Sequence, residues 1–215
     1  MIKAVIYDLD GTLIDSEREY LKANAQAAQA LGYPYQPADF LPLVGVDERA
    51  YHQALAAMMN ETEIPEFTRL SQKIVAMVMQ RPPLMRDTKA TLEAVAERHV
   101  VQAIVSSNHR SYVQQVLAAA QIADFFAAII AFEDVPAAKP DPAGYLRMQA
   151  LLHVNRDEVL VVEDSQVGVT AAQNAHLPVV QIPDLDGVNT TGAPVLKHLG
   201  ELPAFIDRRN EHPFA

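Results

Sequence analysis

The chain contains no cysteine, and this absence excludes disulfides, thiolate zinc sites and cysteine nucleophiles. It also lacks any apolar run approaching the length that a membrane-spanning helix needs. Asp8 and Asp10 come too early in the chain for the apolar core of a secretory signal peptide. From these absences we expect a cytoplasmic protein.

Positive charge is also scarce, because 17 Lys and Arg residues stand against 27 Asp and Glu residues and give a net charge of −10. Such a field repels nucleic acid and anionic membranes, so we expect neither as a partner. Hydrophobic residues make up 50% of the 215 residues, which is ample for a packed interior. The composition does not decide the oligomeric state, for which we expect a monomer or a weak homodimer.

Short apolar runs alternate along the chain with segments whose apolar residues recur at helical spacing. The first run lies between Lys3 and Asp8. Alternation of this kind favours a parallel sheet with helices on both faces, so we predict an α/β, Rossmann-like core. Further strands are expected at residues 100–105, 128–132, 159–162 and 179–182, and helices at residues 91–97, 111–120, 142–152 and 168–175.

Residues 16–81 interrupt the alternation, because they carry helical patterns and no convincing strand. Helices are expected at residues 17–31, 47–59 and 66–79, and Gly32 follows the first of them as a stop signal. We therefore predict an all-helical domain of residues 16–81, inserted into a core of residues 1–15 and 82–215.

Two carboxylates, Asp8 and Asp10, follow the first apolar run and are themselves followed by Gly11. Acids that end a buried parallel strand project into the crevice where such sheets bind ligands. Because carboxylates this close repel each other, the pair predicts a divalent metal or one acid held protonated. Asp and Gly are also common in turns after strands, so the pair alone does not distinguish a turn from a site.

Three further polar groups follow apolar runs later in the chain, namely Ser106, Lys139 and Glu163 with Asp164. A hydroxyl, a lysine and a second acidic pair are what a metal-assisted phosphoryl-transfer site needs. Each also has an ordinary structural explanation, because a strand-end serine, a surface lysine or a helix-capping acid is common. Their joint occurrence, in this order, favours the functional interpretation.

These residues resemble the motifs of the haloacid dehalogenase superfamily of phosphotransferases, in the branch of β-phosphoglucomutase and the small sugar-phosphate phosphatases. Asp8-Leu9-Asp10-Gly11-Thr12 is similar to the first motif, Ser106 to the second, Lys139-Pro140 to the third, and Glu163-Asp164-Ser165 with Gly168 to the fourth. The resemblance spans nearly the whole chain, and its first and fourth motifs are specific.

The resemblance implies a role for each matching residue. Asp8 would be the nucleophile that forms an aspartyl-phosphate, and Asp10 would be the general acid and base. Magnesium would be bound by Asp8, the backbone carbonyl of Asp10 and Asp164, and Glu163 would either bind the ion or orient a metal-bound water. The phosphoryl group would be held by Ser106, Ser107, Lys139, Thr12 and the backbone near Leu9. For Thr12, a local turn role is an equal alternative.

In this family an inserted helical domain is a cap that closes over a small phosphorylated metabolite and excludes water. Residues 16–81 would be that cap. The candidates for substrate contact are Tyr20, Arg49 and Lys73 in the cap, and Asn108 and His109 at the mouth of the crevice. Each of them is explained equally well as a solvated, packing or helix-start residue.

The same resemblance favours a phosphatase, with a sugar phosphate as the expected substrate, over a β-phosphoglucomutase-type mutase. The mutase branch tends to have a histidine near the position of Tyr20, and an arginine that follows a Gly-Val pair one residue sooner than Arg49 follows Gly45-Val46. A non-catalytic phosphate-binding protein on the same scaffold is the alternative of another class. A signalling receiver domain is disfavoured by the Asp-x-Asp-Gly-Thr motif and the helical insertion, and a dehalogenase by the acid at Asp10.

Overall fold

The computed structural model describes residues 1–46, 48–185, 187 and 192–211. Its centre is a five-stranded sheet with the order β3-β2-β1-β4-β5, in which all neighbouring strands are parallel. The strands are β1 (Ala4–Tyr7), β2 (Val101–Val105), β3 (Ala128–Ile130), β4 (Val159–Glu163) and β5 (Val179–Gln181). The structure confirms the predicted parallel α/β core.

Side chains of β1 alternate between two hydrophobic cores, as the pleat of a strand requires. Val5 and Tyr7 belong to one core, and Ala4 and Ile6 belong to the other.

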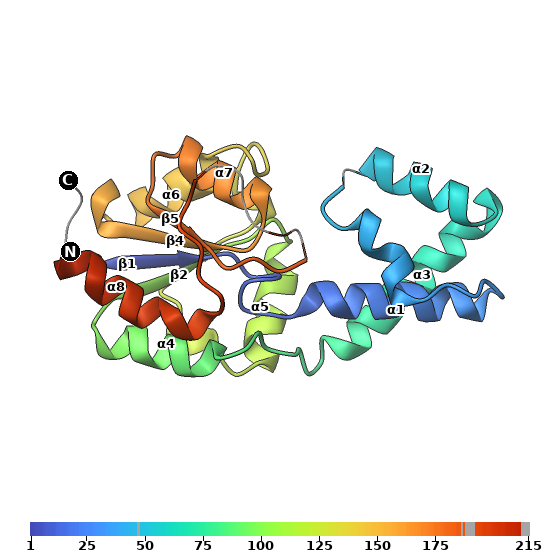
Figure 1. Ribbon diagram of the computed structural model, residues 1–215, viewed down its shortest axis with the longest axis horizontal. Helices are drawn as coiled ribbons and strands as arrows, with labels where there is room; N and C mark the ends of the chain where they lie inside the picture. Colours follow the sequence, from blue (N-terminus) through green and yellow to red (C-terminus); the bar gives the residue numbers. More distant parts are fainter. Residues whose placement is uncertain (47, 186, 188–191, 212–215) are drawn as a thin grey trace.

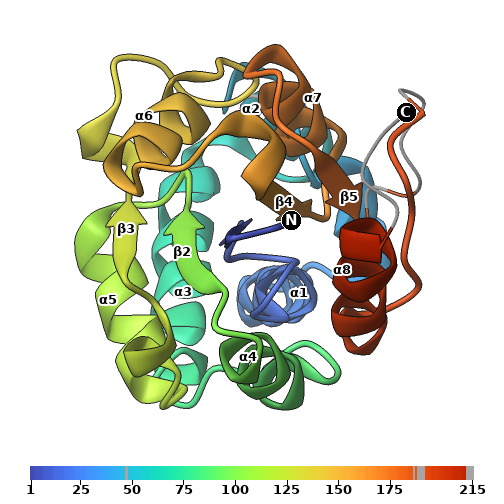
Figure 2. The same cartoon turned by 90° about the vertical axis from the view of Figure 1, so that its left-hand side faces the viewer.

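Helices cover both faces of the sheet, and Figure 2 shows α6 and α7 on the side opposite α4 and α8. The helices of this domain are α4 (Thr88–Glu97), α5 (Arg110–Ala119), α6 (Ala143–Leu151), α7 (Gln166–Asn174) and α8 (Leu202–Glu211). Short 3₁₀ helices lie at η3 (Ala123–Phe125), η4 (Phe132–Asp134), η5 (Arg156–Glu158) and η6 (Leu199–Glu201).

The helix α8 is an element that the apolar pattern did not predict. It buries Leu202 and Ile206, which lie four residues apart and therefore on one helical face. An ion pair of 2.7 Å between Arg98 and Asp207 joins it to the end of α4. With two buried apolar residues among charged ones, the segment carries too weak a periodic signal to be recognised in the sequence.

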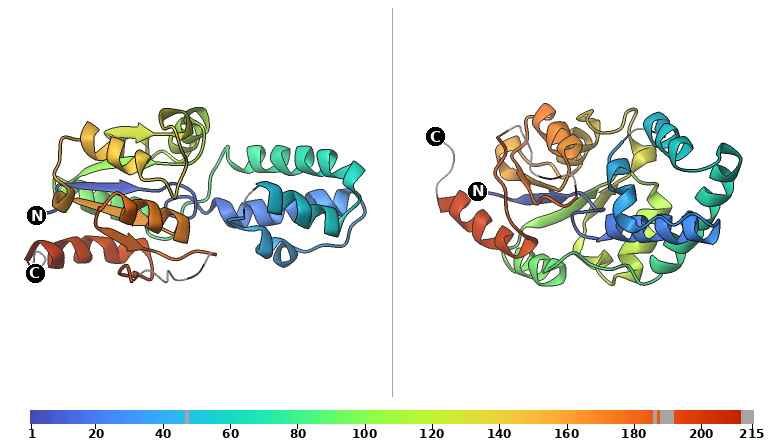
Figure 3. Two further views of the ribbon diagram at one scale, coloured as in Figure 1. Left: turned by 90° about the horizontal axis from the view of Figure 1, so that it is seen from above. Right: turned by 45° about the vertical axis from the view of Figure 1, so that its right-hand side comes forward.

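A second group of helices projects from one end of the sheet domain and is called the helical lobe (Figures 1 and 3). It consists of α1 (Ser16–Ala30), η1 (Pro37–Leu43), α2 (Glu48–Met58), η2 (Glu61–Glu63) and α3 (Ile64–Val78). Alanine makes α1 a strong helix former, and the chain turns after it at Gly32, whose φ of +88° suits glycine. The lobe has its own hydrophobic core, in which the rings of Phe40 and Phe67 stack at 5.9 Å.

Two antiparallel chain segments connect the lobe to the sheet domain. The backbone amide of Asp15 donates to the carbonyl of Pro83 at 2.9 Å, and that of Met85 donates to Leu13 at 2.9 Å. These hydrogen bonds pair the outgoing and returning chain beside the end of β1. The assignment of residues 16–81 as a separate cap domain, with a core of residues 1–15 and 82–215, stays a prediction.

Within the described ranges, none of the helices combines the length and the apolarity needed to cross a bilayer.

Candidate active site

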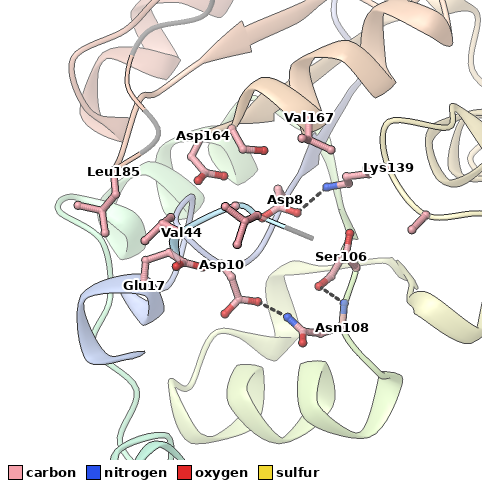
Figure 4. A pocket seen from close by; sticks show the side chains of 15 residues that line it. Asp8, Asp10, Glu17, Val44, Ser106, Asn108, Lys139, Asp164, Val167 and Leu185 are labelled. Atoms are coloured by element: carbon pink, nitrogen blue, oxygen red, sulfur yellow. Dashed lines mark hydrogen bonds and ion pairs between the residues drawn. The ribbon is translucent and has the colours of Figure 1, made fainter. Parts of the chain in front are cut away.

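A cleft of about 440 Å³ opens at the carboxyl ends of the central strands, where parallel sheets bind ligands. Asp8 follows β1, Ser106 follows β2, and Glu163 is the last residue of β4. The sheet therefore brings together groups that are far apart in the sequence (Figure 4). The cleft is lined, among others, by Asp8, Asp10, Ser106, Ser107, Asn108, Lys139, Asp164, Glu17, Val44 and Gly45.

Lys139 lies at the base of the cleft and joins two of the acids. Its Nζ atom is 2.5 Å from Oδ1 of Asp8 and 2.6 Å from Oε1 of Glu163. It also donates to the carbonyl of Val105 at 3.1 Å. Tyr145, fully buried on α6, donates a further hydrogen bond to Glu163. The lysine is thus fixed in place by the residues around it.

Burial and mutual repulsion set the protonation of these groups. Burial raises the pKa of Asp8 to about 7, although the positive charge of Lys139 opposes the rise. Burial, and then the charges of Asp8 and Glu163, hold the pKa of Asp164 well above its usual range. Burial alone lowers the pKa of Lys139, but the charges of Asp8 and Glu163 outweigh it and raise that pKa well above the ordinary value. With all three carboxyls ionised, the site would hold more negative charge than one lysine balances, so it favours either bound protons or a further cation.

The acids at this point have the geometry of a cation site. One carboxylate oxygen each of Asp8, Glu163 and Asp164 lies within 4.8 Å of the others. Two glycines make room for them, because a Cβ atom at Gly168 would lie 2.0 Å from the carboxylate of Glu163 and one at Gly11 would lie 2.3 Å from Oδ2 of Asp164. Hard oxygen donors of this kind fit Mg²⁺ and similar divalent ions.

Asp10 is held apart from this acidic group by two hydrogen bonds. Asn108 donates to its Oδ2 at 2.8 Å, and the hydroxyl of Tyr112 donates to its Oδ1 at 2.9 Å. Burial raises the pKa of Asp10, and the nearby Ser16 hydroxyl and the hydrogen bonds from Tyr112 and Asn108 oppose that rise. A carboxyl whose pKa is raised is suited to carry a proton, which is what a general acid requires.

The predicted phosphate-binding residues fall into two groups. Ser106 and Ser107 line the cleft, and the Ser106 hydroxyl accepts a hydrogen bond of 3.1 Å from the backbone amide of Asn108. The hydroxyl of Thr12 instead donates to Oδ1 of Asp164, a predicted metal ligand, at 3.2 Å, and Thr12 is buried outside the described lining of the cleft. The side chain of Leu9 is buried in the core, which leaves only its backbone for a phosphate contact.

The predicted substrate contacts are also divided by the structure. Asn108 lies beside Asp10, and Tyr20 lines a second cavity that adjoins the cleft. Arg49 and Lys73 are exposed and lie outside the described lining of both cavities. His109 is exposed, and its Nδ1 atom is 2.8 Å from Glu133.

Tyr112 and Tyr145 are site residues that sequence reasoning did not find. Each lies on a helix and reaches its acid from outside the motifs, so that only the packing of that helix against the sheet brings it into contact. Together the groups place two carboxyls of different environment, a candidate cation site and a buried lysine around one cleft. These are the components of metal-assisted phosphoryl transfer.

Comparison with known proteins adds independent findings. A model of the family described as haloacid dehalogenase-like hydrolase matches residues 5–182. An uncharacterized protein of Lacticaseibacillus casei is 36% identical over 187 residues, which cover 86% of each chain. The phosphorylated carbohydrates phosphatase of Thermotoga maritima is 30% identical over 181 residues, or 82% of each chain. A solved HAD family hydrolase of Deinococcus radiodurans, with bound phosphate and sodium, superposes with a TM-score of 0.85 at 22% identity, over 100% of this chain and 99% of that one.

Proposed function

Because this chain belongs to the haloacid dehalogenase-like hydrolase family, we propose that it is a magnesium-dependent phosphatase of a small phosphorylated metabolite. Membership confirms the family resemblance and the prediction of a hydrolase. The observation that carries the proposal is the contact of Lys139 with both Asp8 and the buried Glu163, beside Asp164, at the base of one cleft. The relative that is named for phosphorylated carbohydrates supports a sugar phosphate as the substrate.

In the proposed mechanism, Asp8 attacks the phosphorus atom and takes the phosphoryl group as an aspartyl-phosphate. Its contact of 2.5 Å with Lys139 favours the ionised, nucleophilic form. Asp10 gives a proton to the oxygen of the leaving alcohol and then takes one from the water that hydrolyses the intermediate. The two acids suit different roles, because Asp8 faces Lys139 and Asp10 faces the neutral donors Asn108 and Tyr112.

Asp8, Glu163, Asp164 and the backbone carbonyl of Asp10 would hold the magnesium ion. When bound, the ion supplies positive charge to the phosphoryl oxygens and offsets the repulsion between the carboxylates. Lys139, Ser106 and the backbone near Ser107 would bind the remaining phosphoryl oxygens. Thr12 would act through Asp164, to which its hydroxyl is bonded.

The helical lobe would serve as the cap. Glu17, Val44 and Gly45 from the lobe line the same cleft as Asp8 and Asp10, so the lobe already forms one wall of the site. A lobe on two connecting segments can close over a bound substrate and exclude water from the aspartyl-phosphate until hydrolysis. Arg49, Lys73 and His109 stay predicted substrate contacts. The cytoplasmic location and the oligomeric state also stay predictions.

The proposal is tested by assaying phosphate release from p-nitrophenyl phosphate and from a panel of phosphorylated sugars and other small metabolites, with magnesium and with EDTA. We expect turnover that requires the metal and disappears in Asp8→Asn. Acid-quenched protein should carry one additional phosphoryl group in the wild type and none in the variant.

Two outcomes would contradict the proposal in different ways. Binding of phosphorylated compounds without any metal-dependent turnover would favour a non-catalytic binding protein. Rapid isomerisation of β-glucose 1-phosphate without phosphate release would favour a mutase.

A further inference from the structure

A second cavity of about 290 Å³ lies within the helical lobe, next to the cleft. Glu17, Val44 and Gly45 line both cavities, so the two adjoin along this wall. The remainder of the second cavity is formed mainly by α1, η1 and α2, including Tyr20, Asn24 and Tyr51. A substrate whose phosphate lies at Asp8 would therefore direct its alcohol portion toward this second space.

The polar groups in the second cavity are mostly neutral, and one of them has a fixed orientation. The amide oxygen of Asn24 accepts a hydrogen bond of 2.6 Å from Ser71, so its NH₂ group is turned toward Tyr51. The distance from that nitrogen to the Tyr51 hydroxyl is 3.5 Å, which is long for a hydrogen bond. An amide donor and phenol hydroxyls of this kind match the hydroxyl or carbonyl oxygens of a substrate.

The charges around the two cavities are predominantly negative. Among the described residues that line them, Lys139 is the only basic one, and it already contacts Asp8 and Glu163. Glu17 lines both cavities and therefore places its side chain at their junction; Figure 4 shows it near Asp10 in the lining of the cleft. The negative charge of Glu17 acts on Tyr20 in the second cavity. Burial, the charge of Asp10 and then that of Glu17 raise the pKa of Tyr20 to about 12.

We propose that the second cavity binds the alcohol portion of the substrate, and that Glu17 selects an uncharged, hydroxyl-bearing group against one that carries a carboxylate or a second phosphate. This inference rests on the proposed phosphatase function and defines its substrate class. A second anion on the substrate would approach Glu17 with no described basic side chain in either lining to receive it. Repulsion between unit charges a few ångströms apart at a protein surface lowers binding on the order of tenfold or more.

The test compares two substrates of the same skeleton, glycerol 3-phosphate and 3-phosphoglycerate, which differ by a CH₂OH group in place of a carboxylate. We expect kcat/KM to favour glycerol 3-phosphate by about tenfold or more at low salt, and by less as salt screens the repulsion. If either compound is turned over too slowly, its inhibition constant against p-nitrophenyl phosphate gives the same comparison.

Glu17→Gln removes the charge while keeping the shape of the side chain, and it should lower this preference several-fold. Glu19→Gln is the matched control, because Glu19 lies in the same first turn of α1 but lines neither cavity. The control should keep the wild-type preference. Equal kcat/KM and equal inhibition constants for the two compounds, or an unchanged preference in Glu17→Gln, would overturn the inference. Failure of the phosphatase proposal itself gives a different result, because the wild type would then show no metal-dependent turnover of p-nitrophenyl phosphate.

Discussion

The hydroxyl of Tyr112 lies 2.9 Å from Oδ1 of Asp10 and donates a hydrogen bond to it, while Asn108 occupies the other carboxylate oxygen. Both oxygens of the proposed general acid are therefore held by neutral donors from the segment that follows β2. A residue that only positions the acid should matter most when the leaving alcohol needs a proton.

Tyr112→Phe tests this role, because it removes the hydroxyl and keeps the ring. A hydrogen bond of this kind contributes about 1 kcal/mol, so we expect kcat for alkyl phosphates to fall by about five- to tenfold. Hydrolysis of p-nitrophenyl phosphate, whose leaving group departs without protonation, should fall much less. An equal loss on both kinds of substrate would instead indicate a general structural role for the hydroxyl.

The parallel sheet and the acids at its carboxyl edge were predictable from the sequence because each depends on short-range pattern. Asp8, Ser106 and Glu163 stand directly at the ends of apolar runs, and strand geometry then dictates that they meet. Tyr145 and Tyr112 were not predictable in this way. Their contacts depend on how α6 and α5 pack on the sheet, and a tyrosine on an amphipathic helix gives no sign of whether its hydroxyl reaches an acid.

Thr12 shows the limit of reasoning from position along the chain. The motif predicts a phosphate contact for Thr12, and this stays a prediction, while the hydroxyl, which follows the turn at Gly11, donates to Asp164. The sequence defines which groups are available, whereas the direction in which each one points follows from backbone turns and packing.

The raised pKa of Asp8 predicts how the stability of the metal-free protein depends on pH. Because that pKa rises from 3.8 to about 7 on folding, mainly through burial, the folded state binds the proton more tightly than the unfolded state. The resulting stabilisation is complete below the unfolded pKa and is lost as the pH rises through about 7. Urea unfolding in EDTA should therefore give a lower free energy of unfolding at pH 8 than at pH 5.

Asp8→Asn should flatten this dependence, although Asp164 adds a contribution of the same sign. Asp207→Asn is the control, because its partner Arg98 lowers the pKa of Asp207 and the group has finished titrating below this pH range. An unaltered difference between pH 5 and pH 8 in Asp8→Asn would show that Asp8 does not hold a raised pKa.

Gly168 is expected to be intolerant of any side chain. A Cβ atom there would lie 2.0 Å from the carboxylate of Glu163, so Gly168→Ala must displace that acid or shift α7. Overpacking of this kind costs about 1–3 kcal/mol of stability, and displacement of Glu163 should weaken magnesium binding measured by calorimetry. Thr170→Ala, on the same helix, removes a hydroxyl that bonds to the carbonyl of Gln166 and should leave magnesium affinity unchanged. Equal magnesium affinities for wild type and Gly168→Ala would contradict the crowding argument.

Lys139 should be needed for folding stability as well as for catalysis. Lys139→Met keeps most of the side-chain volume but leaves Asp8 and Glu163 without their buried positive partner. Removing one partner of a buried ion pair costs about 3–5 kcal/mol, so we expect a loss of this size in metal-free unfolding at pH 8. The loss should shrink at pH 5, because Asp8 is then protonated and leaves less uncompensated charge.

Lys22→Met provides the comparison, since the exposed pair of Lys22 with Glu19 is worth less than about 1 kcal/mol. Losses of similar size in the two variants would mean that the contacts of Lys139 are as weak as those of a surface lysine.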